Sequence, residues 1–527
     1  MDFSWDFPYA SQRMPVLAEN VVATSQPLAA QAGLNMLRKG GNAVDAALAA
    51  AIALTIVEPT MNGIGGDAFA IVWDGEKLHG LNGSGRSPAT LSLDQFAGRA
   101  SMPELGWEAV TVPGAVDAWS TLSQRFGRLP FCDLFEPAIQ YAHDGYAVSP
   151  ITAGRWSEAA ERYKDFPDFG RVFLPGGRAP KATELFYCPR QARTLEEIAA
   201  TRGESFYRGK LADQILAYSA SSGGYFSKDD LAQHQSEWVT PISVAYEEIR
   251  LHEIPPNGQG MIALIALGIL QHLDIGNYAV DSADSIHLQI EAMKIAFAEA
   301  NRQIADPDSM RIDPHELLDD SFLRARANDI QMTQAGFPTS TLPVDKGTVY
   351  LSSADRSGMM VSFIQSNYWG FGSGIVDPQT GISFQNRGCG FNLEKGHPNC
   401  VAGHKRPFHT IIPGFITRQQ KPLMSFGVMG GHMQPQGHVQ MVLRLFTYGQ
   451  NPQAASDAPR WYVGNDHVVA LEKGHDQSIM EDLKRRGHPV TVDVPPALFG
   501  GAQLIVKMDR VYCAASDHRK DGQAVGF

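Results

Sequence analysis

The 527-residue sequence predicts a layered α/β domain built around packed sheets. Three observations favour this fold class. Stretches with helical periodicity alternate with short β-rich runs, no strong linker or internal repeat interrupts them, and 44% of the residues are hydrophobic. That hydrophobic content is close to the globular average, which excludes a disordered, collagen-like or coiled-coil chain. Length alone, at about 150 residues per domain, would suggest three or four domains.

The N-terminal part of the chain is predicted to be mainly helical. Residues 27–39 have a periodic apolar pattern, with Ser25 as the N-terminal cap and Gly40 as the stop. Residues 42–57 are apolar on nearly every face, so this second helix is expected to be buried. The glycine-rich residues 61–67 lack the spacing of a nucleotide-binding loop, and we expect a close-packed turn there.

Further along, residues 110–116 predict a short strand that ends in a Pro-Gly turn, followed by a helix with Trp119 and Leu122. Apolar spacing predicts more helices at residues 137–148, 260–273 and 285–302.

The C-terminal third is richer in β structure. Residues 348–353 and 359–365 are two β-rich runs around a short polar turn, the pattern of a β-hairpin. Residues 423–428 predict another strand, residues 429–431 a turn, and residues 435–447 a helix.

Composition and charge argue against several classes of partner. The formal charge is −12 and the longest basic run is residues 484–486, so we expect no nucleic-acid partner. The five cysteines are scattered and form no Cys-x-x-Cys pair, which argues against a disulfide framework or a structural zinc site. The first eight residues carry acids where a signal peptide has basic residues, and the longest apolar stretch, residues 46–57, is shorter than the roughly 20 residues that span a bilayer. We therefore expect a cytoplasmic protein without a membrane partner.

Two common catalytic centres are poorly supported by the sequence. Four histidines crowd one part of the chain: His404, His409, His432 and His438. Their spacing is irregular and no His-Glu-x-x-His motif occurs, so we expect hydrogen-bonded side chains, no metal and no cofactor. Residues 370–374 hold a serine among glycines but lack the spacing of a nucleophile elbow, and we expect a flexible loop.

A threonine nucleophile is the third possibility. Gly347 places a small residue directly before Thr348, which begins a β-rich run. If the bond between them is cut, Thr348 gains a free α-amine beside its hydroxyl, so one residue supplies both base and nucleophile. The predicted hairpin brings Thr348 near residues 364–366, where Ser366 could hydrogen-bond the Thr348 hydroxyl.

A strand-to-helix turn downstream could complete such a site. Gly430 and Gly431 could offer backbone N–H groups to a developing oxyanion. On these features alone, an ordinary strand-starting threonine and an ordinary turn remain open alternatives.

Several ordered motifs extend from about Asn20 to the last residue. They are GGNAVDA (40–46), EPTMNGIGG (58–66), VPG (112–114), DKGT (345–348), FGSGI (371–375), KRP (405–407) and DHRKDG (517–522). In these motifs the chain resembles the γ-glutamyltransferases, a family of self-cleaving N-terminal nucleophile hydrolases.

The resemblance implies a four-layer αββα fold and autocatalytic cleavage between Gly347 and Thr348. Residues 1–347 would form a large subunit and residues 348–527 a small one, together making one αββα domain. This is a heterodimer derived from one chain, and whether two such heterodimers pair is left open. By position, Thr348 is similar to the family's nucleophile, Ser366 replaces a supporting threonine, and Gly430 and Gly431 match the oxyanion hole.

The sequence also departs from the family at the positions that hold a γ-glutamyl group. An early arginine falls on Ser84, with Arg86 displaced by two; a Ser-Ser pair becomes His409 and Thr410; a glutamine and an aspartate fall on Arg387 and Gly390; and an asparagine becomes Tyr368. Losing the aspartate removes the counter-charge for a substrate ammonium, whereas an arginine can bind a carboxylate bidentately. We expect Arg387, His409, Thr410, Tyr368 and Arg86 to bind substrate, with pairing of Arg387 to a protein acid as the alternative.

These features predict an amidohydrolase or acyltransferase that forms an acyl-Thr348 intermediate from an amide with a carboxylated acyl group. Oxamate-like amides, dicarboxylic monoamides and cephalosporin-type side chains are candidate substrates. One alternative is a γ-glutamyl hydrolase or transpeptidase that acts on glutathione. Another is an uncleaved binding or scaffold protein without catalysis, and a metal hydrolase is a more distant one.

Overall fold

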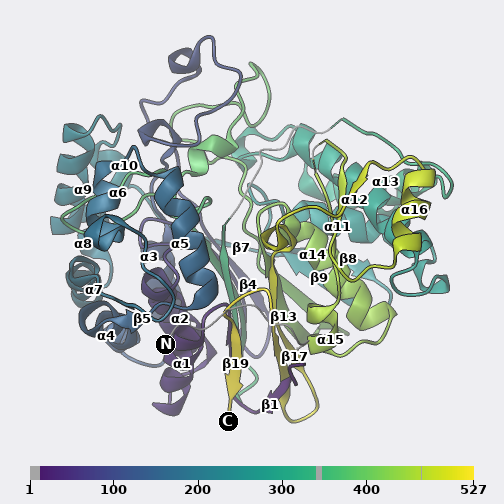
Figure 1. Cartoon of the computed structure of the whole chain (residues 1–527), viewed down its shortest axis with the longest axis horizontal. Helices are drawn as coiled ribbons and strands as arrows, with labels where there is room; N and C mark the ends of the chain where they lie inside the picture. The colour runs from purple at the N-terminus through teal and green to yellow at the C-terminus, as the bar shows by residue number, and fades with distance from the viewer. Residues whose placement is uncertain (1–11, 340–346, 465) are drawn as a thin grey trace.

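Two antiparallel sheets of seven strands each lie face to face at the centre of the molecule, with helices on both outer faces (Figure 1). The computed structural model describes residues 12–339, 347–464 and 466–527. The helices of the N-terminal half cover one sheet, and those labelled α11 to α16 cover the other. The architecture is the four-layer αββα arrangement that the resemblance implies.

Each sheet takes strands from both sides of Gly347. The first sheet has the order β19 (Gln523–Gly526), β2 (Val21–Thr24), β10 (Val349–Ala354), β11 (Met360–Ser366), β3 (Asp67–Trp73), β4 (Leu78–Gly83) and β7 (Glu237–Val239). The second has the order β1 (Val16–Ala18), β18 (Tyr512–Ser516), β17 (Gly501–Lys507), β13 (Lys421–Met429), β12 (Gly414–Arg418), β9 (Ile249–Glu253) and β8 (Ile242–Tyr246). The prediction of three or four separate domains, from length alone, is therefore wrong, because strands from the two ends of the chain are neighbours in one sheet.

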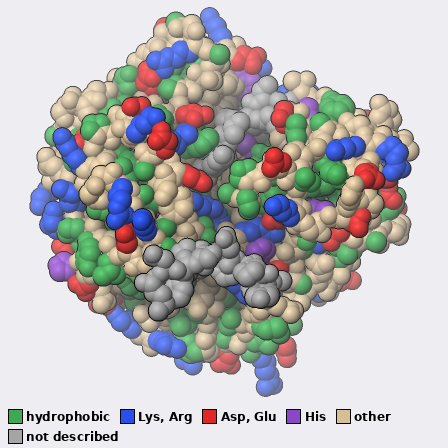
Figure 2. Space-filling view, viewed as in Figure 1, with side chains coloured by type: hydrophobic (Ala, Val, Ile, Leu, Met, Phe, Trp, Pro, Cys, Tyr) green, Lys and Arg blue, Asp and Glu red, His purple; other side chains and the backbone are tan. Residues whose placement is uncertain are grey.

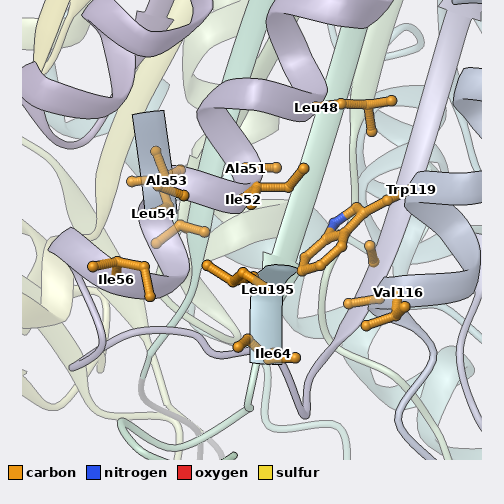
Figure 3. Packing of buried hydrophobic residues seen from close by; sticks show 14 of the residues in the cluster. Leu48, Ala51, Ile52, Ala53, Leu54, Ile56, Ile64, Val116, Trp119 and Leu195 are labelled. Atoms are coloured by element: carbon orange, nitrogen blue, oxygen red, sulfur yellow. The ribbon is translucent and has the colours of Figure 1, made fainter. Parts of the chain in front are cut away.

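The helical layer on the first sheet contains ten α-helices among the described residues. They are α1 (Pro27–Arg38), α2 (Ala43–Val57), α3 (Ala115–Phe126), α4 (Glu136–Asp144), α5 (Pro150–Arg162), α6 (Pro167–Phe173), α7 (Pro189–Thr201), α8 (Glu204–Arg208), α9 (Lys210–Ser221) and α10 (Lys228–Ala232). Every residue of α2 is buried, as its apolar composition predicts. Figure 3 shows Ile52 of α2 beside Trp119 of α3 and Leu195 of α7.

The layer on the second sheet is formed by α11 (Gly260–Leu270), α12 (Ala283–Gln303), α13 (Asp320–Asn328), α14 (Met433–Val442), α15 (Pro452–Asp457) and α16 (Gln477–Arg485). Within the described parts of the chain, no helix combines the length and the apolar character needed to cross a membrane. On the face seen in Figure 2, basic and acidic side chains are interspersed.

Alternation along the strands produces three apolar layers. In β3, Ala68 and Ala70 pack against the first helical layer, whereas Phe69 and Ile71 pack between the sheets. A strand with helices on one face and a second sheet on the other is buried on both faces. The side chains that point between the sheets are the ones that can meet residues from both.

Most predicted elements are confirmed, but two local predictions are wrong. Residues 110–114 form no strand: the Val112 N–H donates to the Arg86 carbonyl, Pro113 has no N–H, and the Gly114 N–H donates to Asp67. The N-terminal cap of α1 is Gln26, not Ser25.

The Gln26 side chain accepts the N–H groups of Leu28 and Ala29, whereas the Ser25 hydroxyl donates to Glu58. The expectation about the first eight residues, and the residues Asp345 and Lys346 of the DKGT motif, lie outside the described residues.

Candidate active site

Three polar residues meet at one end of the first sheet. The register of β10 against β11, extended by one residue, sets Thr348 opposite Ser366. Ser366 is also paired with Asp67 at the start of β3. Because side chains alternate along a strand, Thr348 points to the same side as Tyr350, which lies between the sheets.

The peptide bond before Thr348 is held by two hydroxyl groups. In this uncut chain the Thr348 hydroxyl donates to the Gly347 carbonyl oxygen at 2.6 Å, and the Ser366 hydroxyl donates to the same oxygen at 2.9 Å. Thr348 and Ser366 are fully buried. The expected bond from Ser366 to the Thr348 hydroxyl is replaced, because both hydroxyls converge on one carbonyl oxygen. Two donors on this oxygen polarise the carbonyl beside a hydroxyl that could attack it.

The Gly430–Gly431 turn follows β13 and precedes α14. Both residues have positive φ, +115° at Gly430 and +55° at Gly431. Their carbonyls accept the N–H groups of Met433 and Gln434 in the first turn of the helix. The Gly431 N–H belongs to the same peptide as the Gly430 carbonyl and points the opposite way, away from the helix. This orientation leaves the turn able to present an N–H to an oxyanion.

Two buried glutamines, which the sequence reasoning missed, support this centre. The Gln434 side-chain N–H donates to the Thr348 hydroxyl oxygen at 3.2 Å. The Gln259 side chain donates to the carbonyls of Gly431, at 2.8 Å, and Thr410. Gln259 therefore connects the Gly430–Gly431 turn to the residues after the KRP motif. A glutamine in an apolar segment carries no signal by itself that would have indicated either role.

Arg387, Thr410 and Tyr368 form one contact group. Arg387 is buried, donates to the Thr410 hydroxyl at 2.7 Å, and lies over the Tyr368 ring with 4.6 Å between the guanidinium carbon and the ring centroid. The Tyr368 N–H donates to the Ser366 hydroxyl at 2.7 Å. Thr410 is only two residues from Ile412, whose N–H donates to Gln434. Short chains of contacts therefore connect Arg387 with the residues around Thr348.

Asp67 and His409 form a second buried pair next to this group. His409 Nε2 lies 3.1 Å from Asp67, and the Ile411 N–H donates to His409 Nδ1, which leaves the His409 proton on Nε2. Burial, with the positive charges of Arg387 and Arg406, holds the pKa of His409 well below its usual value.

Burial raises the pKa of Asp67 to about 7, although the charge of Arg387 and the hydrogen bonds from Gln385 and two backbone N–H groups oppose this. Asp67 directly follows the EPTMNGIGG motif, and that position was the one available signal for it.

Two further positions that the resemblance singled out, Arg86 and Ser84, are hydrogen-bonded to protein groups. Arg86 donates to Asp306 at 2.9 Å and to the His404 carbonyl, and it lines a cavity of about 250 Å³. Ser84 is buried and donates to Asn82 at 2.7 Å.

Gly390 borders a cavity of about 450 Å³, which we call the Gly390 cavity; its lining includes Met102, Phe391 and Phe408. The Gly390 backbone is closely packed on its other side, since a Cβ added there would lie 2.6 Å from the Phe408 carbonyl oxygen.

Three of the four clustered histidines, His409, His432 and His438, have side chains that hydrogen-bond to protein groups, as expected. His432 bonds to Gln259, and His438 bonds to Glu253 at 2.6 Å. Among the described residues, the group with metal-compatible spacing is a different one, His287, Glu291 and His488. The ammonium of Lys294 bonds to both Glu291 and His488, and a cation already in that position disfavours a metal ion.

Comparisons with known proteins agree with the resemblance. The family profile described as Gamma-glutamyltranspeptidase matches residues 29–527. The chain is 34% identical over 519 residues to the glutathione hydrolase-like YwrD proenzyme of Bacillus subtilis, covering 97% of this chain and 98% of that protein. It is 33% identical over 516 residues to the oxamate amidohydrolase proenzyme of Klebsiella pneumoniae, covering 95% and 97%.

Among solved structures, the cephalosporin acylase from Bacillus halodurans superposes with a TM-score of 0.96 at 47% sequence identity. That match covers 100% of this chain and 99% of the acylase.

Proposed function

The chain belongs to the gamma-glutamyltranspeptidase family of amidohydrolases, and on that premise we propose that it is a precursor that cuts itself before Thr348 and then hydrolyses amides through that residue. The observation that carries the proposal is the pair of hydroxyls, from Thr348 and Ser366, on the Gly347 carbonyl oxygen. A nucleophile, a polarised carbonyl and a nearby glycine turn are the parts that acyl transfer requires.

Self-cleavage would proceed by an acyl shift within the chain. The Thr348 hydroxyl oxygen attacks the Gly347 carbonyl carbon, the carbon–nitrogen bond breaks, and the hydroxyl proton ends on the new α-amine. Water then hydrolyses the ester, giving a Gly347 carboxylate and a free Thr348 hydroxyl. Ser366 supports the first step by donating to the carbonyl oxygen as negative charge develops there.

Turnover would repeat this chemistry on a substrate amide. The free α-amine of Thr348 accepts the hydroxyl proton and passes it to the leaving amine, and the acyl group stays on the hydroxyl oxygen as an ester. The Gly430–Gly431 turn would stabilise the oxyanion, and water or a second amine would release the acyl group. The active form would be a heterodimer of residues 1–347 and 348–527.

For the acyl group we propose a carboxylate without a neighbouring amine. The buried guanidinium of Arg387, oriented by Thr410 and the Tyr368 ring, supports carboxylate binding. The names of two relatives, oxamate amidohydrolase and cephalosporin acylase, are consistent with acyl groups of this chemistry.

Purified protein on a denaturing gel tests the cleavage. Native protein should give two bands, and mass spectrometry should find Thr348 at the start of the smaller fragment. The Thr348→Ala variant should stay uncut. A single native band with no amide hydrolysis would refute the proposal and leave a binding or scaffold role.

A panel of amides tests the acyl group. Oxamate, monoamides of longer dicarboxylic acids and a carboxylated cephalosporin side chain should be hydrolysed faster than a γ-glutamyl anilide. The reverse order would favour a glutathione hydrolase and contradict the role given to Arg387.

A further inference from the structure

We propose that Gln434 is a catalytic residue that donates a hydrogen bond to the attacking oxygen of Thr348, both in self-cleavage and in amide turnover. The inference rests on the proposed role of Thr348. It concerns an oxygen different from the one that the glycine turn serves. The turn would stabilise the carbonyl oxygen, whereas Gln434 contacts the hydroxyl oxygen that would form and later release the ester.

The position of Gln434 is rigid. It lies in the first turn of α14, and its side chain is fully buried. Its side-chain oxygen accepts the Ile412 N–H at 3.0 Å, which assigns the other end of the amide as NH₂. That NH₂ group donates to the Thr348 hydroxyl oxygen at 3.2 Å. The Gln434 amide is therefore held between a backbone group and the reacting atom.

The bonds around the Thr348 oxygen show why this donor matters. The single hydroxyl proton of Thr348 points to the Gly347 carbonyl, and Gln434 donates to a lone pair of the same oxygen. When the oxygen attacks, its proton passes to the amine and negative charge develops on it. A fixed N–H donor stabilises that charge without reorganisation.

The same reasoning applies when the ester is broken. Water adds to the acyl carbon, the bond to the Thr348 oxygen breaks, and this oxygen leaves with negative charge before it takes up a proton. The N–H of Gln434 would stabilise the leaving oxygen as it did the attacking one. We therefore expect loss of this donor to slow acylation and deacylation alike.

Gln436 offers a matched control two residues further along α14. It is also a fully buried glutamine, but its side chain bonds to the His432 carbonyl at 2.9 Å and to the backbone of Val463. Gln434→Met and Gln436→Met therefore remove buried amides of the same size from the same helix. Only Gln434→Met removes a contact with Thr348.

The first experiment follows self-cleavage of full-length chains on a denaturing gel, which requires no knowledge of the substrate. Gln434→Met should cut itself about 10- to 100-fold more slowly than native protein, the effect expected for one hydrogen bond to a charged group. Gln436→Met should cut itself at a rate close to that of native protein. With the cleaved enzyme, kcat should fall in Gln434→Met while KM changes little.

Gln434→Glu provides a second test, in which a residue with only a packing role would give a different result from a hydrogen-bond donor. Its carboxyl can still accept the Ile412 N–H, but it can donate to Thr348 only when protonated. The ratio of its cleavage rate to the native rate should therefore rise as the pH is lowered.

The inference is overturned if Gln434→Met cuts itself within about twofold of the native rate. If that variant does not fold, a pH-independent rate ratio for Gln434→Glu overturns it instead. Failure of native protein to cut itself would refute the proposed function and not this residue alone.

Discussion

Gly347 has a backbone conformation that few other residues adopt. Its φ is +116°, and a Cβ added there would lie 2.8 Å from the Gly370 nitrogen and 3.0 Å from the Tyr368 carbonyl oxygen. The conformation aims the Gly347 carbonyl at the two hydroxyls. A side chain at this position would thus disturb the peptide bond at which we propose cleavage.

Gly347→Ala should slow self-cleavage about tenfold or more, because left-handed strain of about 1–2 kcal/mol adds to the steric shift of the carbonyl. The measurement is the time course of fragment appearance on a gel. Gly396→Ala is the control, since Gly396 also has positive φ, +88°, but open space around its Cβ position. Equal cleavage by Gly347→Ala and native protein would contradict this account.

The raised pKa of Asp67 would make the proposed substrate binding dependent on pH. Its pKa is raised to about 7, so it is neutral below that pH and carries a negative charge above it. His409 stays neutral on both sides of pH 7, because its pKa is held well below the usual value. Ionisation of Asp67 near Arg387 would therefore reduce the positive charge available to the proposed substrate carboxylate.

We expect KM for a carboxylated amide to rise by up to about tenfold as the pH increases through 7, the equivalent of one pKa unit of interaction. Initial rates across pH 5.5–8.5 would measure it. Asp67→Asn cannot ionise, so its KM should be nearly constant over that range. A native KM that falls through pH 7 would exclude the mechanism.

At the scale of elements, α2 begins at a complete capping box. The Asn42 side chain accepts the Asp45 N–H at 3.1 Å, and the Asp45 carboxylate accepts the Asn42 N–H at 2.9 Å. The Asn42 side chain also donates to the Phe126 carbonyl. One residue therefore fixes both the start of this buried helix and its contact with α3.

Asn42→Ala should lower the free energy of unfolding by about 1–2 kcal/mol through loss of the cap. Urea unfolding would be compared in the Thr348→Ala background, where the chain remains in one piece. Asn35→Ala, in α1, is a control without an N-terminal cap to lose. An unchanged urea midpoint for Asn42→Ala would contradict the prediction.

What the sequence can predict depends on how local the determining contacts are. The helix at 42–57 and the hairpin that brings Thr348 to Ser366 depend on neighbouring residues, and periodicity predicts them. The bond between His409 and Asp67 joins residues 342 positions apart, and Gln434 is 86 positions from Thr348. Local patterns do not specify such contacts, because the order of strands across two sheets decides them.

At the scale of the whole molecule, the proposed cut does not divide the fold into two units. β10 of the C-terminal fragment lies between β2 and β11, and β2 belongs to the N-terminal fragment. In the second sheet, β12 pairs with β9 across the same division. Each fragment alone would expose strand edges that are paired in the intact molecule.

The two fragments should therefore elute together in size-exclusion chromatography after cleavage and separate only under denaturing conditions. Residues 1–347 and 348–527 produced as separate chains should be insoluble or unfolded by circular dichroism. A soluble, folded fragment on its own would show that the sheets can be completed in another way.

This interleaving has a genetic consequence. A mature molecule cut before Thr348 would inherit both of its fragments from a single translated polypeptide, because strands already woven into the two sheets cannot be exchanged without unfolding. In a cell that carries two defective alleles, one lacking Thr348 and one lacking Asp67 of the N-terminal fragment, hybrid molecules would not arise. Complementation between the two fragments would be absent, although each defect lies in a different piece of the mature protein.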